Sequence, residues 1–435
     1  MVSAQQFART VQLFQDDLGI KDADSVLRAL TGASFLLVAD EATVSTLSGQ
    51  VAITTSAFLM ARSGHRVFLD LPDAPLIGDQ PPMNGSTLYE ALQAEGGQIV
   101  DGLEIAIGCP LFEPDVAFVF GSRDLARFAK AKRVVSVGWT DWAGELGDYP
   151  YVAKAEKSDW PIGGMIAATL VAAEAIKVAG RRMLPLATRN AGHFRELFED
   201  SQSSVLRLAH EDTPKISQLG RFDVISAGAV TNATLYALLR LPQVSGVARV
   251  FDRDVSDETN RNRNMLLTCG FLGLSKVELF KAFENGLKIE PVARHFQEQD
   301  LEDIAQSVIV GVDDIPIRWL IARAAPSWMS VGATSHFAAM SSVHFSTSGC
   351  AGCLHPHDEE QDGPIPTISF VSFLAGLMTA VDFLRDAAGV ESTLQSRQRF
   401  LSPLQVAGDY TAGVPPREDC PVECAASTLK RGLSA

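Results

Sequence analysis

A repeated order of strand-like segments divides this chain of 435 residues into two similar halves. Three segments of the first half, each rich in apolar or β-branched residues, recur in the same order in the second half. The matching pairs are Arg66–Asp70 with Arg249–Asp252, Val116–Gly121 with Val308–Gly311, and Ser136–Thr140 with Ser330–Thr334. Such a repeat is typical of a structural unit that is used twice. The sequence therefore predicts two similar domains in one polypeptide.

The order of elements within each half indicates the class of fold. Each half begins with a buried-strand pattern, continues with a helical stretch, and then gives a second strand. Units of this kind form parallel sheets with right-handed crossovers. We expect an α/β protein with two Rossmann-like domains in tandem. The expected divisions are a helical segment at 1–32, a first domain at 33–180, a polar and irregular linker at 181–220, and a second domain at 221–435 that ends in an irregular tail from 402.

Charge and hydropathy argue against two classes of partner. The formal net charge of −15 at pH 7 does not suit a protein that binds nucleic acid through a basic surface. The most apolar stretches, 161–180 and 365–384, contain Glu174, Lys177 and Asp382, so we expect buried helices too short or too polar to span a membrane. The first twelve residues lack the apolar core of a secretory signal. We expect a cytoplasmic protein.

Four of the six cysteines form two close pairs. Cys350 and Cys353 are separated by two residues, and Cys420 and Cys424 by three. In a cytoplasmic protein, this spacing favours a tetrahedral Zn²⁺ site. Reduced thiols or disulfides remain the alternative. Cys109 and Cys269 stand alone in the sequence, and we expect both to be thiols in the core.

Small residues followed by acidic ones indicate a nucleotide site in the second half. Gly228 and Ala229 lie in the turn between the expected strand Phe222–Ser226 and the next helix, where a phosphate can approach the backbone and the helix N-terminus. Asp252, at the end of the following strand, can accept hydrogen bonds from a ribose. Ser226 and Thr231 occupy positions where glycine is expected, so this pattern alone is weak.

The residues from Asp252 onward carry a more specific pattern. Asp252, Asp254, Asn260 and Arg263 are spaced as in the D-x-D-x-V-x-x-x-N-x-x-R signature of the ubiquitin-activating superfamily, which this segment resembles. The one departure is Ser256 in place of valine. That superfamily includes the ThiF/MoeB-like adenylyltransferases. The resemblance covers about residues 220–430 well, and 33–180 as a degenerate copy.

Further motifs extend the resemblance and imply the ligands. Lys276 lies where the superfamily keeps a phosphate-binding lysine, and Asp313–Arg318 is similar to its D-[ND]-x-x-x-R motif, whose first aspartate holds Mg²⁺. The two cysteine pairs match its zinc site in position and order. The resemblance therefore implies ATP, Mg²⁺ and Zn²⁺ as cofactors, and adenylation-type domains of which the second is active. Cations at Arg263 and Lys276 suit the attack of a carboxylate on the α-phosphate of ATP.

The first half lacks the features of a nucleotide site. Asp40 and Glu41 follow its first strand, where small residues and positive charge are needed, and Arg123 stands where Asp313 stands in the second half. Activating enzymes of this kind commonly pair an inactive half with an active one, and the inactive half supplies an arginine near its N-terminus. The segment Phe7–Phe14 is similar to that region, so Arg9 is the candidate. A solvated helix arginine is the alternative.

The nucleophilic cysteine of thioester-forming members is missing. No cysteine occurs between Cys353 and Cys420, and Thr367 stands at the expected position with Ser369 two residues later. A hydroxyl nucleophile needs an adjacent base, for which His355, His357 and Asp358 are candidates. Thr367 could instead cap the following helix. The protein could also stop at the adenylate, or pass the acyl group directly to a partner.

The resemblance implies an activating enzyme whose substrate is the C-terminal tail of a ubiquitin-like protein and whose next partner is a conjugating enzyme. A bacterial pathway suits a single-chain member without the cysteine. One alternative is adenylation of a sulfur-carrier protein or peptide without conjugation. Others are a nicotinamide-dependent oxidoreductase and a catalytically silent scaffold. A homodimer is compatible with the sequence, which does not determine the oligomeric state.

Overall fold

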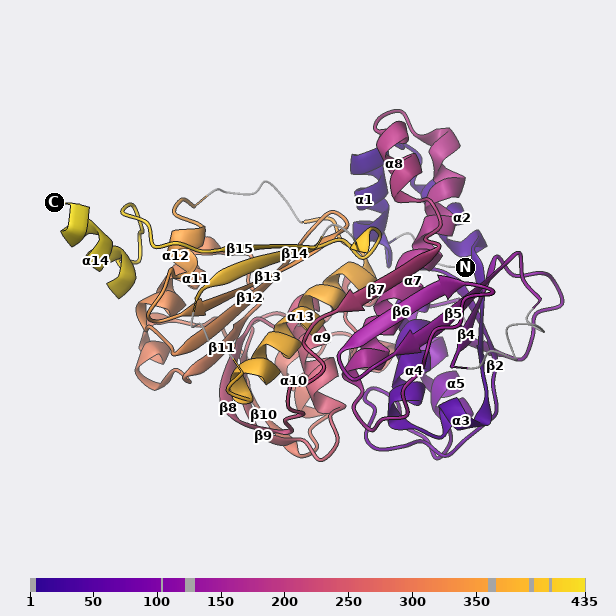
Figure 1. Cartoon of the computed structure of the whole chain (residues 1–435), viewed down its shortest axis with the longest axis horizontal. Helices are drawn as coiled ribbons and strands as arrows, with labels where there is room; N and C mark the ends of the chain where they lie inside the picture. Colours follow the sequence, from indigo (N-terminus) through magenta and orange to yellow (C-terminus); the bar gives the residue numbers. More distant parts are fainter. Residues whose placement is uncertain are drawn as a thin grey trace.

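Two twisted sheets lie side by side with helices between them, in a computed structural model that describes residues 5–102, 105–121, 130–358, 365–390, 395–406 and 409–434 (Figure 1). The first sheet has the strand order β3-β2-β1-β4-β5-β6-β7, and the second has the order β10-β9-β8-β11-β12-β13-β14-β15. In each sheet the first five strands of that order are parallel and the rest antiparallel. The two sheets therefore match strand for strand, except for β15.

The strands of both sheets are short, and most of them follow the apolar runs of the sequence. In the first sheet they are β1 Ser34–Ala39, β2 Arg66–Asp70, β3 Ile105–Ile107, β4 Val116–Phe120, β5 Arg133–Trp139, β6 Ala143–Asp148 and β7 Ser203–Arg207. In the second they are β8 Gln218–Ile225, β9 Ser245–Phe251, β10 Leu287–Val292, β11 Ser307–Val310, β12 Trp328–Ser335, β13 Ala338–Phe345, β14 Arg397–Leu401 and β15 Tyr410–Gly413. The three repeated segments form β2 and β9, β4 and β11, and β5 and β12, so the repeat found in the sequence occupies equivalent places.

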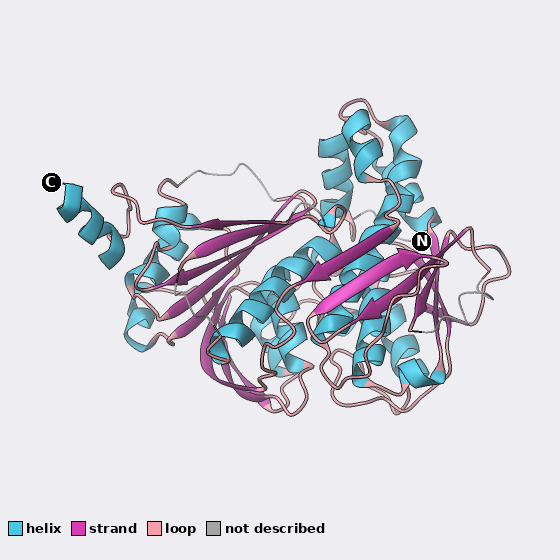
Figure 2. Cartoon of the chain, viewed as in Figure 1, coloured by secondary structure: helices cyan, strands magenta, loops and turns pink. Residues whose placement is uncertain are grey.

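Helices connect the strands and separate the sheets (Figure 2). Those of the first half are α1 Ala8–Leu18, α2 Ala23–Gly32, α3 Glu41–Val44, α4 Leu47–Arg62, α5 Leu88–Ile99, α7 Ile162–Met183 and α8 Ala191–Leu197. Those of the second half are α9 Ala229–Leu239, α10 Lys276–Lys281, α11 Ile315–Arg323, α12 Ala351–Leu354, α13 Ser369–Ala387 and α14 Ala425–Ser434. Short 3₁₀ turns are η1 Leu184–Leu186, η2 Glu258–Asn260, η3 Cys269–Phe271 and η4 Glu298–Asp303.

One hydrophobic core runs through both halves. Helices α4 and α7 of the first half pack against α13 of the second, which also packs on α9. Every residue of α4 is buried, and α7 is buried along almost its whole length, because each is covered on all sides. Such helices carry no polar face, since apolar side chains meet protein all round. The halves therefore form a single packed body.

The long helix α7 corrects one expectation from the sequence. Among the described residues, Ile162–Leu186 is long and apolar enough to cross a membrane by length and composition, whereas we expected this stretch to be too short or too polar. Its most apolar window is entirely buried within the protein. Glu174 and Lys177, which suggested polarity, pair with each other at the buried end near Arg133. Its burial within the protein, and not its composition, distinguishes this core helix from a membrane-spanning helix.

The interval 181–220 is more ordered than its polar sequence predicts. It contains the end of α7, helix α8, strand β7 and the start of β8. Strand β7 pairs antiparallel with β6 and extends the first sheet, so it was missed because an exposed edge strand needs few apolar residues. The C-terminal tail is likewise not wholly irregular, because β15 pairs with β14 and α14 follows Cys424.

The N-terminal helices are joined to the second half by an aromatic cluster. Phe14 of α1 and Phe194 and Phe198 near α8 surround Phe337, which lies in the turn between β12 and β13. In the same turn, His336 lies 2.7 Å from Asp17 of α1. The hairpin formed by β12 and β13 therefore holds helix α1 in place.

Candidate nucleotide and acyl-transfer site

A cavity of about 1440 Å³ opens at the carboxyl ends of β8, β9 and β11 in the second sheet. Ligands in open α/β sheets bind at this edge, where the strand order reverses between β8 and β11. Its lining contains all of the predicted nucleotide residues together with Arg9 and Thr367: Arg9, Gly228, Ala229, Asp252, Asp254, Asn260, Arg263, Lys276, Asp313 and Thr367. The fold thus brings together residues that lie far apart in the sequence.

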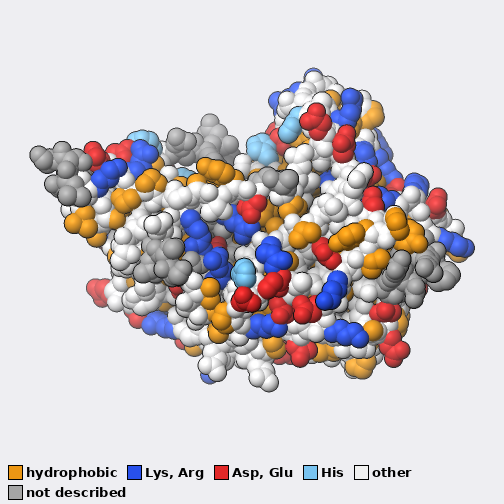
Figure 3. All heavy atoms as spheres, in the orientation of Figure 1, with side chains coloured by type: hydrophobic (Ala, Val, Ile, Leu, Met, Phe, Trp, Pro, Cys, Tyr) orange, Lys and Arg blue, Asp and Glu red, His pale blue; other side chains and the backbone are white. Residues whose placement is uncertain are grey.

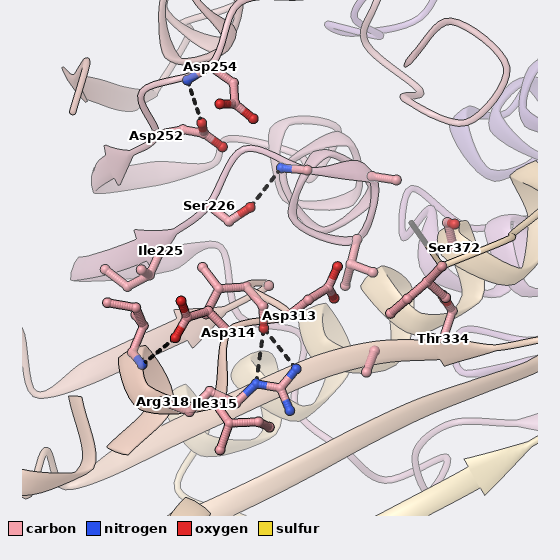
Figure 4. Close-up of a pocket in the computed structure, with 18 of the residues that line it drawn as sticks. Ile225, Ser226, Asp252, Asp254, Asp313, Asp314, Ile315, Arg318, Thr334 and Ser372 are labelled. Atoms are coloured by element: carbon pink, nitrogen blue, oxygen red, sulfur yellow. Dashed lines mark hydrogen bonds between the residues drawn. The ribbon is translucent and has the colours of Figure 1, made fainter. Parts of the chain in front are cut away.

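The turn between β8 and α9 aims the helix N-terminus into this cavity (Figure 4). Ser226 adopts φ 90°, a left-handed conformation that favours glycine, and its Oγ accepts a hydrogen bond from the Gly228 N–H at 3.1 Å. Gly228 is the N-cap of α9, and no side chain caps the helix. The N–H groups of the first turn therefore remain directed at the cavity, which suits an anion.

Asp252 holds the backbone of two loops at the cavity, the one after β8 and the one after β9. Its Oδ2 accepts from the Ala227 N–H at 2.7 Å, and its Oδ1 accepts from the Asp254 N–H at 2.8 Å. The carboxylate at the end of β9 thus fixes the loop after β8. Thr231, the second departure from the glycine pattern, packs against Gly311, where an added Cβ would lie 2.6 Å from the Thr231 Cγ2. Helix α9 can therefore still approach the sheet closely, because Gly311 on the sheet side has no side chain.

Asp313, Arg9 and Arg263 come from separate parts of the chain, line the same cavity and lie close enough for their charges to influence one another. Burial raises the pKa of Asp313, and the charges of Arg318, Arg9 and Arg263 oppose that rise. Burial lowers the pKa of Arg263 to about 10, and the nearby charge of Arg9 contributes to that fall. The Asp313 carboxylate is open to the solvent of the cavity, and accepts no hydrogen bond from the described residues. It is therefore available to a cation.

Arg9 reaches this site from the first turn of α1. Burial lowers the pKa of its guanidinium, while Asp313 and Asp257 oppose the fall. Its Nη1 is buried and has no hydrogen-bond partner among the described residues. A buried donor without an acceptor is costly, so a ligand oxygen at this point would satisfy it. Arg9 is only partly buried, so the solvated helix arginine considered from the sequence stays an alternative to a role in the site.

Lys276 and Asn260 take part in local contacts at the rim. Lys276, the first residue of α10, donates to Asp254 Oδ2 at 2.9 Å, and this hydrogen bond lowers the pKa of Asp254. Asn260 accepts from the Asp257 N–H at 3.2 Å and so caps the η2 turn. Both side chains line the cavity, but in this structure the Lys276 ammonium and the Asn260 Oδ1 already have protein partners.

Thr367 and Ser369 lie in different surroundings although only two residues apart. Thr367 lines the cavity, is 6% exposed, and has its Oγ1 2.9 Å from the Ser372 Oγ. Ser369 is 0% exposed, lies outside the cavity lining, donates to the Leu59 carbonyl at 2.9 Å and contacts the Ser63 Oγ at 2.8 Å. Ser369 therefore joins the halves, and only Thr367 faces the site.

The four paired cysteines come together beside α12. Their sulfur atoms all lie within 4.8 Å of one another, with Cys350–Cys420 at 3.5 Å and Cys353–Cys424 at 3.7 Å. A tetrahedral ion with Zn–S bonds of about 2.3 Å places sulfurs about 3.8 Å apart, so the cluster is compatible with zinc. These separations are far from the S–S bond of a disulfide. Gly352 is required here, since a Cβ would lie 2.6 Å from Val422.

The other two cysteines are not in the core. Cys109 and Cys269 are both exposed, which corrects the expectation of buried thiols. Cys109 donates to Asp70 at the end of β2, and Cys269 lies 3.5 Å from the Gln98 side chain. Cysteine is among the most frequently buried residue types, and that tendency misled the prediction because both residues fall in loops that cross the surface.

Asp257 was given no role from the sequence, and Arg318 was recognised only as the last residue of the Asp313–Arg318 motif. Asp257 faces Arg9 and Arg263, and Arg318 donates to the Val312 carbonyl from Nε at 3.0 Å and from Nη2 at 2.8 Å, holding the Asp313 backbone. The D-x-x-N spacing of a capping box could have indicated Asp257. Arg123, compared above with Asp313, lies outside the described residues.

A second cavity, of about 260 Å³, lies between α13 and the antiparallel strands β13 to β15. Its arginines already face acidic side chains, with Arg397–Asp382 at 3.1 Å and Arg399–Asp409 at 2.6 Å. Basic and acidic groups are likewise interspersed over the middle of the face shown in Figure 3. Paired charges of this kind stabilise a surface weakly and do not by themselves form a ligand site.

Solved structures give several distant matches. A crystal structure of PaaA is 15% identical, covers 45% of this chain, is itself covered to 64%, and has a TM-score of 0.37. E. coli MccB with MccA is 13% identical, with 66% of this chain and 97% of that chain covered and a TM-score of 0.40. E. coli MccB with ATP is also 13% identical, with 67% and 97% covered and a TM-score of 0.40. This chain thus spans less than two thirds of PaaA.

Comparisons of sequence give one match. No curated protein matches the chain. A family model described as the BilD N-terminal domain matches residues 34–194. The matched residues begin with β1 and end within α8, so the likeness covers most of the first sheet and not the cavity of the second. In this part of its sequence, the chain is similar to the N-terminal domain of BilD.

Proposed function

We propose that this chain is an ATP-dependent activating enzyme that adenylates the C-terminal carboxylate of a ubiquitin-like protein. The observation that carries the proposal is the Arg9 Nη1, which has no hydrogen-bond partner among the described residues and shares one cavity with Asp313, Arg263 and the N-terminus of α9. Oriented N–H groups, two guanidinium groups and one free carboxylate suit a polyphosphate with its metal ion. The carboxylate-bearing tail enters the same cavity on the side of Thr334, Met340 and Gln398.

The chemistry asked of these residues is the joining of two anions. A carboxylate oxygen of the tail attacks the α-phosphorus of ATP, the bond to the bridging oxygen breaks, and pyrophosphate leaves with the electron pair. Charge accumulates on the phosphate oxygens, where Arg9 and Arg263 lie close enough to stabilise it. Asp252 positions the helix turn against the nucleotide through the Ala227 N–H. The protein thus supplies orientation and positive charge.

Asp313 fits a magnesium ion. Its carboxylate lies within the influence of the charges of Arg318, Arg9 and Arg263 and accepts no hydrogen bond from the described residues, whereas the neighbouring Asp314 caps α11. Mg²⁺ prefers carboxylate and phosphate oxygens, and when bound it neutralises charge on the leaving pyrophosphate. The Cys350–Cys424 cluster, which fits zinc, has no open position facing substrate. We assign it a structural role around α12 and the C-terminal segment.

The proposal is tested by exchange of labelled pyrophosphate into ATP. The candidate ubiquitin-like protein is isolated by co-purification and then supplied either with its free C-terminal carboxylate or as the C-terminal amide. Exchange should depend on the free carboxylate, because an amide cannot attack phosphorus. No exchange with the free form, at saturating ATP and Mg²⁺, would contradict adenylation. Exchange without a later covalent adduct or transfer would favour the alternative of a sulfur-carrier or peptide adenylyltransferase.

The next step in the proposal is transfer of the acyl group to the hydroxyl of Thr367. The Thr367 hydroxyl would attack the acyl carbon, AMP would leave, and the proton would pass to a base. Ser372 is its immediate hydrogen-bond partner, and His355, His357 and Asp358 line the same cavity. The carrier would then be held as an oxyester until a conjugating enzyme accepts it.

The chain offers a matched control for this step. Thr367→Ala should remove a covalent adduct that survives thiol reducing agents but is cleaved by hydroxylamine, while pyrophosphate exchange persists. Ser369→Ala should keep the adduct, because Ser369 faces Leu59 and not the cavity. Thr367→Cys should give a thioester instead. An enzyme that activates the carrier without forming any adduct would favour direct transfer from the adenylate.

A further inference from the structure

A wholly buried arginine of the first half binds the backbone of the second. Arg62 is the last residue of α4 and is 0% exposed. Its Nη2 donates to the carbonyls of Met265 at 3.1 Å and Leu267 at 2.9 Å, and its Nη1 donates to the carbonyl of Arg261. Hydrogen bonds between a buried cation and carbonyl oxygens are strong, because no water competes for them. Arg62 therefore fixes the path of 261–267.

This backbone segment carries part of the nucleotide cavity. Arg263 lies between the carbonyls that Arg62 holds, and Asn260 precedes them by one residue. The segment is also held from other directions. The Leu266 N–H donates to the Asn232 Oδ1 at 2.9 Å, and the Arg261 side chain reaches into the first half to the carbonyls of Ile99 at 3.1 Å and Gln98 at 2.9 Å.

We propose that Arg62 is a positioning residue of the nucleotide site, through which the first half sets the placement of Arg263 and Asn260. The expected effect of Arg62 on ATP binding rests on the proposed function. The hydrogen bonds that Arg62 makes do not depend on it. Lysine at position 62 has one ammonium group in place of a planar fork, so it cannot bond three separated carbonyls in the same way. A small displacement of the segment would carry Arg263 away from the phosphates. Misplacement of about 1 Å can cost about a hundredfold in rate.

A second buried arginine provides a control at the same interface. Arg240 caps the end of α9, is 1% exposed, and donates to the carbonyls of Pro81 at 2.9 Å and Gln80 at 3.2 Å in the first half. Arg240 belongs to the second half and binds the backbone of the first, whereas Arg62 belongs to the first half and binds the backbone of the second. Neither Arg240 nor its partners line the nucleotide cavity. Replacement of either arginine by lysine should weaken the contact between halves, and only Arg62 should alter the site.

The experiment compares Arg62→Lys with Arg240→Lys, each in the full chain and at a temperature where both remain folded. We expect both variants to unfold at a lower temperature than the unchanged protein. Arg62→Lys should weaken binding of Mg²⁺–ATP at least about tenfold more than Arg240→Lys does, measured by equilibrium dialysis. Amide hydrogen exchange of 261–267 should be faster in Arg62→Lys and unchanged in Arg240→Lys.

Equal ATP affinities in the two variants, or unaltered amide exchange of 261–267 in Arg62→Lys, would overturn the inference. The amide measurement needs no substrate. An unchanged protein that binds no ATP would therefore contradict the proposed function, while the exchange of 261–267 would still decide whether Arg62 holds this segment. A gain of ATP affinity on restoring arginine by the reverse substitution completes the comparison.

Discussion

The carboxyl ends of β1 and β8 occupy equivalent places in the two sheets, yet the cavity of about 1440 Å³ lies at the end of β8, and its lining includes no residue of β1 or of the turn after it. After β1, Asp40 caps the short helix α3, and the Thr43 hydroxyl donates to the Phe120 carbonyl at the end of β4 at 3.3 Å. After β8, no such helix intervenes, and α9 begins at Ala229 with its N-terminus directed into the cavity. The turn that contains α3 covers in the first half the region that is open in the second.

The glycines at these edges show how closely the scaffold is shared. Gly121 follows β4 and Gly311 follows β11, and an added Cβ at either would lie 2.6 Å from a threonine, Thr43 or Thr231. The close contact is kept in both halves, although the threonine belongs to α3 in one and to α9 in the other. The repeated sheet therefore supplies a common frame, while the loop after the first strand of each sheet decides whether a ligand has room.

The largest effect should come from removing Asp313. We expect Asp313→Ala to lower carrier-dependent pyrophosphate exchange by about a thousandfold or more, because it removes the carboxylate that fits Mg²⁺. The matched change in the first half, Asp40→Ala, removes only a helix cap and should cost about 1 kcal/mol of stability with exchange intact. Exchange in Asp313→Ala at more than about a tenth of the normal rate would break the comparison between the two edges.

The cysteine cluster gives the next effect, on stability. Freshly purified protein should contain about one zinc per chain, and Cys350→Ser should release it and destabilise the second half by several kcal/mol. Cys109→Ser, at an exposed thiol of the first half, should change neither metal content nor unfolding temperature. Metal analysis and thermal unfolding decide this together, and protein that contains no zinc would contradict it.

Arg9 tests whether the first half contributes directly to the second site. Arg9→Ala should reduce exchange by about a hundredfold, since it removes a guanidinium whose buried Nη1 has no hydrogen-bond partner among the described residues. Arg28→Ala, on the neighbouring α2, removes a surface charge paired with Asp22 at 3.2 Å and should leave exchange unaltered. Similar rates in both variants would mean that the first half acts only as a scaffold.

The smallest effect concerns a buried carboxyl near Arg62. Burial raises the pKa of Glu95 from its ordinary value to about 7, and the charge of Arg62 opposes that rise. Because the folded protein holds this proton more tightly than the unfolded chain, the free energy of unfolding should fall as pH rises from about 4.5 through 7. Solvent screens the partly exposed group, so the loss should be on the order of 1 kcal/mol. Glu95→Gln should remove this part of the pH dependence in chemical unfolding curves from pH 5 to 8.

Several features of the fold follow from the sequence because they depend on local patterns. The apolar runs of β1, β4 and β11 and the turn Ser226–Ala229 predict strands and a helix start without knowledge of neighbours. Strands β7, β14 and β15 were missed, because they lie at or near the antiparallel edge of each sheet and carry polar residues on exposed faces. Pairing with a partner strand, and not hydrophobic burial, makes them part of the sheet.

The residues of the candidate site also form two groups, those that the sequence indicated and those whose place only the structure revealed. The sequence predicted Asp252, Arg263 and Asp313 as members of one site, because their spacing resembles a known motif, and all three line the same cavity. Only the tertiary structure decided that Thr367 faces the cavity while Ser369 joins the halves, and that Arg9 and Arg62 act across the interface. The reason is physical. Which residues follow a strand is a property of neighbours along the chain, whereas burial and hydrogen bonding between distant segments exist only once the two halves share one core.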